Sequence, residues 1–262
     1  RKSPGSRNWP RAFEVGGELL RDIADVLFPP RSHSCRQVTD NLTAGIFCPA
    51  CAGDIRYIAA PICPACGAPA PEGAGAETLC GDCLTAPKPF HLARSVAVFA
   101  GVLLEIIHRF KYRRHPELGR FLGRLMTERA CAGVQVRDYS VIVPVPLHVR
   151  RLRERGFNQS LLLARAVAAR YGVPVDFLSL KRERDTPPQT TMGRRERQAN
   201  IRGAFRVADG NMIRDRSVLL IDDVYTTGST LAECARALLD SGAARVGVLT
   251  LARAVPDADG GM

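Results

Sequence analysis

The sequence predicts an α/β protein in which helices flank a parallel sheet, preceded by a small cysteine-rich module. Seven of the nine cysteines fall between residues 35 and 83, whereas short apolar runs alternate with amphipathic stretches after residue 90. Such alternation is typical of a parallel sheet that is covered on both faces. A chain of 262 residues, 46% of them hydrophobic, is long enough for one full domain and a smaller module.

The first 30 residues are expected to form a helical segment. Apolar residues recur at steps of three and four between residues 14 and 27, and Phe28-Pro29-Pro30 ends the pattern. Residues 31–90 are rich in Cys, Pro, Gly and Ala and poor in periodic apolar residues, so a core there requires a crosslink. The boundary of the larger domain, residues 91–262, is placed near residues 88–93.

Two cysteine pairs in the module have the spacing of metal ligands. Two residues separate Cys63 from Cys66 and Cys80 from Cys83, so both thiolates of each pair can reach one tetrahedral ion. We therefore expect these four cysteines to hold a structural zinc ion. Redox dithiols are the alternative interpretation of such pairs.

A second zinc site in the same module is incomplete. Cys48 and Cys51 form a pair, but Val38 stands three residues after Cys35, where a second cysteine is expected. Either this site has decayed or another residue replaces the missing ligand. His33 is the nearest candidate, although a lone histidine in a polar loop is usually solvated. The hypothesis is a site made of His33, Cys35, Cys48 and Cys51, so residues 31–90 would form a double zinc ribbon.

The larger domain alternates strands with helices. Strands are predicted at residues 95–99, 141–145, 175–180, 217–221 and 245–251, and helices at residues 103–112, 159–171 and 230–239. The stretch 181–203 interrupts this rhythm with charged residues, Pro and Gly. Long excursions in compact domains often serve as lids over a site.

The strongest chemical signal follows the strand predicted at residues 217–221. Asp222 and Asp223 come directly after it, and a short loop then leads into a helix. Ligands of parallel sheets bind at the carboxyl ends of strands, and a phosphate gains hydrogen bonds and a favourable dipole at a helix start. The loop and the helix start offer Thr226, Thr227, Gly228, Ser229 and Thr230.

Two acids followed by a phosphate-binding loop describe a ribose 5-phosphate site. The acids would accept hydrogen bonds from sugar hydroxyls or hold a magnesium ion, while the loop binds the phosphate. The alternative is an acidic turn after a core strand. The chain contains no G-x-x-x-x-G-K-[ST] and no G-x-G-x-x-G, which disfavours ATPase and dinucleotide-binding functions.

These residues resemble the ribose-phosphate signature of type I phosphoribosyltransferases, which use phosphoribosyl pyrophosphate (PRPP). Together with the cysteine module, further motifs resemble the ComF family of competence-associated proteins. They are Phe110-Lys-Tyr112, Pro144-Val-Pro-Leu-His148, Arg151 with Arg155-Gly-Phe-Asn-Gln159, Thr186 with Gln189, and Arg197 with Asn200 and Phe205. The resemblance implies a type I phosphoribosyltransferase-like sheet behind a double zinc ribbon, and a role in DNA uptake and nucleotide metabolism.

The resemblance also implies magnesium-dependent phosphoribosyl transfer with release of pyrophosphate. Such a reaction builds positive charge on the ribose and needs orientation and electrostatics more than a nucleophile. Basic residues after the strand ending at residue 145 would neutralise the pyrophosphate, although a solvated basic turn is the alternative. The expected catalytic residues are Asp222, Asp223, Arg151 and Arg155, PRPP binding would add Arg150, and the lid residues would be Thr186, Gln189, Arg197 and Asn200.

The charge distribution keeps a second function open. The chain carries a net charge of +11, and residues 109–206 hold 22 basic and eight acidic residues, enough to attract nucleic acid. The alternative function is a non-catalytic accessory that binds single-stranded DNA and competence or DNA-processing proteins, although aromatic residues are few. DNA affinity lost on reversing Arg113, Arg114 and Arg120 would support it. A codon bias toward arginine is the structural alternative, since only four of the 37 basic residues are lysine.

The sequence also predicts where the protein resides. No apolar run approaches the roughly 18 to 20 residues that span a bilayer, and residues 1–11 lack the apolar stretch of a secretory signal. We therefore expect a cytoplasmic protein with reduced cysteines.

Overall fold

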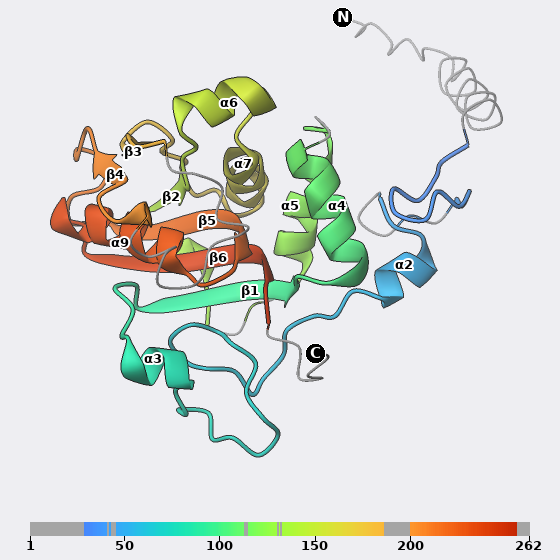
Figure 1. Cartoon of the computed structure of the whole chain (residues 1–262), viewed down its shortest axis with the longest axis horizontal. Coiled ribbons are helices and arrows are strands. Elements are labelled where there is room, and N and C mark those ends of the chain that lie inside the picture. The colour runs from blue at the N-terminus through green and yellow to red at the C-terminus, as the bar shows by residue number, and fades with distance from the viewer. Residues whose placement is uncertain are drawn as a thin grey trace, which may run out of the picture. The chain divides into compact units, whose positions relative to one another are not determined.

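The chain forms two compact units, Arg1–Ala52 and Gly53–Met262, and each contains one cysteine cluster. The computed structural model describes residues 29–40, 42, 46–112, 115–129, 131, 133–185 and 200–255, shown in Figure 1. The helix expected at residues 14–27 lies outside them. The contact boundary precedes the region 88–93, so the second cysteine cluster packs as part of the larger unit.

The smaller unit has little regular structure in its described residues. An isolated antiparallel bridge joins Arg31 to Val38, and helix α2 (Pro49–Gly53) carries the buried Cys51. Ile46 and Phe47 are fully buried. The few buried apolar side chains among residues 29–40, 42 and 46–52 give this segment little hydrophobic stabilisation, so a metal crosslink suits it.

A four-stranded parallel sheet forms the centre of the larger unit (Figure 1). Its order is β1 (Leu92–Val98), β6 (Arg245–Arg253), β5 (Ser217–Tyr225) and β2 (Val141–Pro144). Strand β5 is internal and pairs in register with β6 from Ser217–Arg245 to Tyr225–Arg253. The residues of β2 and most of those of β5 are buried, as expected for a sheet covered on both faces.

Helices cover the two faces of this sheet. Val218 and Leu220 belong to the core that includes Leu231 and Leu238 of helix α9 (Ser229–Asp240). The alternate residues of β5 point to the opposite face, where α7 (Gln159–Tyr171) packs against β5 and β2 and α5 (Leu118–Glu128) packs against α7. Helix α4 (Gly101–Tyr112) follows β1, and a short 3-10 helix, η1 (Val136–Asp138), precedes β2.

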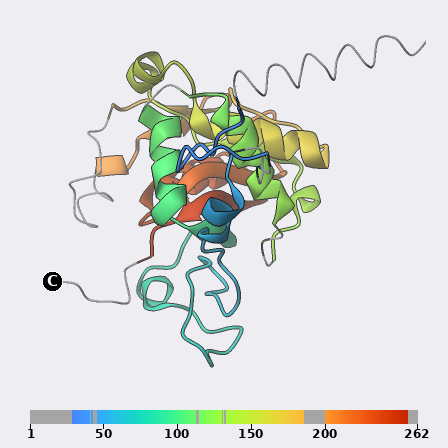
Figure 2. The same cartoon turned by 90° about the vertical axis from the view of Figure 1, so that its right-hand side faces the viewer.

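The second cysteine cluster lies at the edge of the sheet. Ala93 of β1 donates its N–H to Ala65, and Val98 donates to Arg56, so residues 56–65 cover the free edge of β1. The short helix α3 (Gly81–Thr85) completes this module, which extends from β1 in both views (Figures 1 and 2). These hydrogen bonds protect the edge of β1 from pairing with another strand.

The excursion predicted at residues 181–203 begins and ends on a small antiparallel sheet. Strand β3 (Leu180–Arg182) pairs with β4 (Phe205–Val207). The strand expected at residues 175–180 is reduced to a single parallel bridge between Val175 and Ile142. Residues 186–199 lie outside the described part of the chain.

Three further elements differ from the sequence prediction. Strand β5 continues to Tyr225, so both acids lie within it. The basic segment after β2 forms helix α6 (Val149–Arg155), capped by the His148 side chain and by Gly156. Helix α5 was not predicted, because Gly119 and Gly123 weaken its helical signal. In the structure, the missing side chain of Gly123 allows α5 to pack closely against α7, since a Cβ there would lie 2.2 Å from the Ala166 Cβ.

Candidate functional site

The loop formed by residues 226–230 lies at the carboxyl end of the internal strand β5. Gly228 has φ 75° and caps helix α9. The Thr227 Oγ1 lies 2.9 Å from the Ser229 Oγ and accepts the Ser229 N–H at 3.4 Å. Backbone N–H groups and hydroxyls therefore gather at a helix start, an arrangement that suits a phosphate.

A buried tyrosine supports this loop. A Cβ at Gly228 would lie 2.3 Å from the Tyr225 Oη, so only glycine fits there. The Arg253 guanidinium lies 4.1 Å from the centroid of the Tyr225 ring, and Phe90 contacts the same ring edge-on at 6.5 Å. The loop thus rests on a fixed aromatic side chain.

Two buried acids precede the loop and are paired with groups from other helices. Asp222 and Asp223 are 8% and 3% exposed. The Ser160 hydroxyl of α7 donates to the Asp222 Oδ1 at 2.7 Å, and the Asp223 N–H donates to the same oxygen at 2.9 Å. The Lys111 Nζ of α4 lies 2.9 Å from the Asp223 Oδ2. Such partners fix the orientation of the two buried carboxylates.

The Asp222 carboxyl has a perturbed pKa. Burial, and then the charge of Asp223, raise the pKa of Asp222 to about 7, although Lys111 and the Ser160 hydroxyl oppose the rise. Asp222 therefore gains and loses a proton near neutral pH. Perturbed carboxyls of this kind are common at functional sites.

Two further motifs meet beside the acids. The Arg155 guanidinium lies 5.4 Å from the Tyr112 ring centroid and donates to the Gln159 side chain. The Phe110 and Phe157 rings lie 5.4 Å apart. Burial lowers the pKa of Arg155, and the charge of Asp223 opposes this effect. The segments around residues 110–112 and 155–160 thus converge on the carboxyl end of β5.

The remaining predicted site residues are more dispersed. Arg150 has a 71% exposed side chain and pairs with Asp185 at 3.3 Å and with Glu154 at 3.1 Å. Arg151 lies on the same helix, and Asn200 lies at the described end of the excursion. The other predicted residues for lid and DNA contacts lie outside the described residues: Thr186, Gln189, Arg197, Arg113 and Arg114.

Sequence reasoning did not assign Ser160 or Lys111 to the site. Lys111 stands within one of the quoted motifs, so its position between Phe110 and Tyr112 was the available signal. Ser160 follows the motif ending at Gln159 and carries no signal of its own. Only the structure, which brings Lys111 of α4 and Ser160 of α7 to the two acids of β5, reveals these two contacts.

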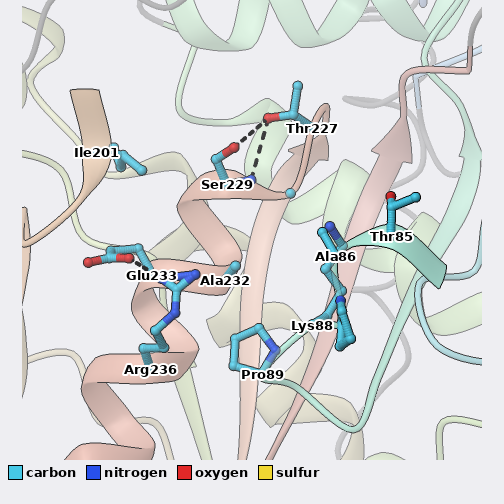
Figure 3. Close-up of a pocket in the computed structure, with 12 residues that line it drawn as sticks. Thr85, Ala86, Lys88, Pro89, Ile201, Thr227, Ser229, Ala232, Glu233 and Arg236 are labelled. Carbon is cyan, nitrogen blue, oxygen red and sulfur yellow. Dashed lines mark hydrogen bonds and ion pairs between the residues drawn. The ribbon is translucent and has the colours of Figure 1, made fainter. Parts of the chain in front are cut away.

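A cleft of about 560 Å³ adjoins the 226–230 loop. Figure 3 shows Thr227 and Ser229 facing each other beside the cleft, with Lys88 on one side and Arg236 of α9 on the other. Glu233, beside Arg236, accepts the Gly203 N–H at 2.6 Å. The lining residues are Thr85, Ala86, Pro87, Lys88, Pro89, Ile201, Thr227, Gly228, Ser229, Ala232, Glu233 and Arg236.

The second cysteine cluster has the geometry of a zinc site. The sulfurs of Cys63, Cys66, Cys80 and Cys83 all lie within 4.8 Å of one another, and those of Cys66 and Cys80 are 3.6 Å apart. Four sulfurs bound to one zinc ion lie about 3.8 Å apart, so the four residues fit the metal. Arg253 donates to the Cys66 carbonyl at 2.8 Å and lies 3.4 Å from its sulfur.

The first cluster brings three cysteines together. The sulfurs of Cys35, Cys48 and Cys51 lie within 4.8 Å of one another, and those of Cys35 and Cys48 are 3.7 Å apart. Among the described residues, the His33 ring is not part of this group. Val38, which is 49% exposed, is not part of it either. The three thiolates fit zinc and need one more ligand.

Comparison with known families agrees with both halves of this architecture. Residues 23–84 match the double zinc ribbon domain, and residues 158–258 match the phosphoribosyl transferase domain. The fold and the cysteine clusters thus define a protein that joins a double zinc ribbon to a phosphoribosyltransferase-type domain. The chain belongs to the ComF family of competence-associated proteins, as its relatives show.

Three of these relatives come from different bacteria. "DNA utilization protein YhgH" of Salmonella typhimurium is 37% identical over 79% of this chain and 89% of its own length. "Competence protein F" of Haemophilus influenzae is 32% identical, over 67% and 78%. "Competence protein ComFC" of Bacillus subtilis is 30% identical, over 79% and 83%.

Among solved structures, the glutamine PRPP amidotransferase of B. subtilis aligns with a TM-score of 0.38 and 18% identity, covering 55% of this chain and 30% of that chain. The hypoxanthine-guanine phosphoribosyltransferase of Leishmania tarentolae aligns with a TM-score of 0.25 and 15% identity, covering 54% and 65%.

Within the described part of the chain, no helix is long and apolar enough to cross a membrane.

Proposed function

We propose that this protein binds PRPP and catalyses magnesium-dependent phosphoribosyl transfer with release of pyrophosphate, as a cytoplasmic step linked to DNA uptake. The observation that carries the proposal is the arrangement at the end of β5. Two buried acids, held by Lys111 and Ser160, stand directly before a loop of hydroxyls and N–H groups at a helix start. A ribose bearing a 5-phosphate complements both parts.

Each part of the site has a chemical role in the proposal. The 226–230 loop, with Thr226 and Thr230 at its ends, would bind the 5-phosphate. Asp222 and Asp223 would accept hydrogen bonds from the ribose hydroxyls and stabilise the positive charge that develops on the sugar. Arg155 and Arg151 on α6 would bind the departing pyrophosphate.

Magnesium fits this site as an ion that arrives with the pyrophosphate. The Asp223 Oδ2 already faces Lys111, and the Asp222 Oδ1 already accepts two hydrogen bonds, which leaves the other carboxylate oxygens for the ligand. The ion would supply positive charge that stabilises the departing pyrophosphate. Thr186, Gln189, Arg197 and Asn200 would close over the site and exclude water.

Calorimetric titration with three ligands tests which part of the site binds what. Ribose 5-phosphate should bind more tightly than inorganic phosphate, and PRPP with magnesium more tightly than either. A positive result justifies screening acceptors for pyrophosphate release. Equal binding of phosphate and ribose 5-phosphate would contradict a role for the acids in holding the sugar.

A second proposal is that single-stranded DNA binds on the helical face of the larger unit, with the zinc ribbons contacting competence or DNA-processing proteins. The Arg120 guanidinium lies 5.0 Å from the Phe121 ring centroid, and Arg165 lies 5.8 Å from that of Phe177. Arg120, Phe121 and Arg165 line a cleft of about 630 Å³. Stacking surfaces beside cations suit unpaired bases.

Charge reversal of Arg120 and Arg165 should abolish a salt-dependent DNA affinity, and no binding at low salt would eliminate this function.

A further inference from the structure

The backbone around Ser32 in the first ribbon repeats the backbone around Cys63 in the second. The Ser32 N–H donates to the Gln37 carbonyl at 2.9 Å, and the Cys63 N–H donates to the Ala68 carbonyl at 2.8 Å. Each of these hydrogen bonds spans five residues. Ser32 and Cys63 therefore open the same type of turn.

The rest of the two turns also corresponds. The Arg36 N–H donates to the Ser32 carbonyl at 3.0 Å, and the Gly67 N–H donates to the Cys63 carbonyl at 2.9 Å. Arg36 and Gly67 both have positive φ, 63° and 71°. Each turn is closed by an isolated antiparallel bridge, Arg31 to Val38 in the first ribbon and Ile62 to Pro69 in the second. Val38 thus corresponds to Pro69 and not to a ligand.

The second halves of the ribbons match as well. The Ala52 N–H donates to the Cys48 carbonyl at 2.9 Å, and the Leu84 N–H donates to the Cys80 carbonyl at 3.0 Å. Each pair of cysteines leads into a five-residue helix, α2 or α3. The first ribbon is therefore a complete knuckle pair in which serine stands at the position of one cysteine.

The Ser32 side chain is buried among the cysteines. Its residue is 0% exposed, and among the described residues its Oγ has no hydrogen-bond partner of ordinary geometry. The Ser32 hydroxyl interacts with the side chains of Cys35 and Cys51. Because a buried hydroxyl without a hydrogen-bond partner is unfavourable, a bound metal ion would stabilise this oxygen.

We propose that Ser32 is the fourth ligand of the first ribbon, so that this ribbon binds zinc through three thiolates and one oxygen and releases it more readily than the second ribbon does. Thiolates favour zinc, and an oxygen in place of one thiolate weakens the site. Cys35 is exposed to solvent, whereas Cys63, Cys66 and Cys83 are buried. This inference is independent of the proposed function.

Three single variants of the full chain separate the candidate ligands. The zinc content and the rate of zinc transfer to a chelator are measured for each. Wild type should contain two zinc ions, one released fast and one slowly. Ser32→Cys should slow release of the fast ion toward the rate of the slow ion, because a fourth thiolate completes the tetrahedral site. Val38→Cys and His33→Ala should leave both rates unchanged.

X-ray absorption of the wild-type zinc protein keeps the proposal testable if a variant fails to fold. In wild type, the two zinc ions together should have seven sulfur ligands and one oxygen ligand. In Ser32→Cys they should have eight sulfur ligands. The proposal is overturned if wild type and Ser32→Cys both hold one zinc ion per chain. It is equally overturned if Val38→Cys slows release, or if His33→Ala loses an ion and a nitrogen ligand disappears from the spectrum.

Discussion

Lys111 forms an ion pair with Asp223, its Nζ lying 2.9 Å from the Oδ2. The pair joins the end of helix α4 to the end of strand β5, which are far apart in the sequence. The lysine balances the charge of one of two adjacent buried carboxylates. The second, Asp222, accepts a hydrogen bond from the Ser160 hydroxyl. The site is therefore assembled by packing between helices and the sheet, before any ligand binds.

Lys111→Met should destabilise the protein and weaken PRPP binding. Removing one partner leaves Asp223 buried without its counter-charge, which costs about 2 kcal/mol for a lysine that retains some exposure. Urea denaturation measures the loss. Lys181→Met, the same change at an exposed position, is the control and should have little effect. Asp223→Asn should recover most of the loss in the Lys111→Met background, and independent effects of the two changes would contradict a direct pair.

The stability of the ligand-free protein should fall as the pH rises toward 7. The pKa of Asp222 is raised to about 7 from the ordinary 3.8, so the folded state binds an extra proton between these values and the free energy of unfolding decreases across that range. Between pH 5.5 and 7.5 the contribution is about 2 kcal/mol. Asp222→Asn should remove this part of the pH dependence. If the free energy of unfolding of the variant depended on pH in the same way as that of wild type, Asp222 would not be the group that titrates in this range.

Gly228→Ala should abolish binding of ribose 5-phosphate. The new Cβ would lie 2.3 Å from the Tyr225 Oη, at a position with φ 75°. Gly203→Ala is the matched control, because its φ is 67° and no atom lies within 4 Å of its Cβ. Both changes should cost about 1–2 kcal/mol of backbone strain. Only Gly228→Ala should also lose the ligand in calorimetry, and unchanged affinity would mean that Tyr225 does not shape the loop.

Arg253→Met should affect two sites at once. Arg253 donates to Cys66 in the second ribbon and stacks on Tyr225 beneath the 226–230 loop. Its loss should speed zinc release from the second ribbon and weaken ribose 5-phosphate binding. Arg94 donates to Pro64 and Ala93 of the same region, so Arg94→Met should affect zinc release alone. Equal effects of both variants on ligand binding would contradict a specific role for Arg253.

Helix α7 shows what the sequence predicts well. It spans Gln159–Tyr171 as expected, because its periodic apolar face is bounded by the Asn158 cap, which accepts two N–H groups, and by Gly172 with φ 74°. Strand β5 shows the limit. Its apolar run ends at Ile221, yet pairing with β6 continues to Tyr225, since side chains from α4 and α7 compensate the two buried acids.

The two zinc ribbons also differ in how much of each the sequence predicts. The four cysteines of the second cluster follow from their spacing alone. In the first cluster, Val38 stands three residues after Cys35, whereas Ser32 stands three residues before it. That spacing equals the spacing of Cys63 and Cys66, so reading serine as a replaced cysteine would have found the position. Its burial among the thiols is visible only in the fold.

Calorimetric titration of PRPP with magnesium into the wild-type protein and an Asp222→Asn, Asp223→Asn double variant tests the central claim most directly. The zinc content and thermal unfolding of both proteins serve as controls for folding. Magnesium-dependent binding to wild type that the double variant loses is the predicted result. No binding to well-folded, zinc-loaded wild type would contradict the account and leave DNA and partner binding as the function of this domain.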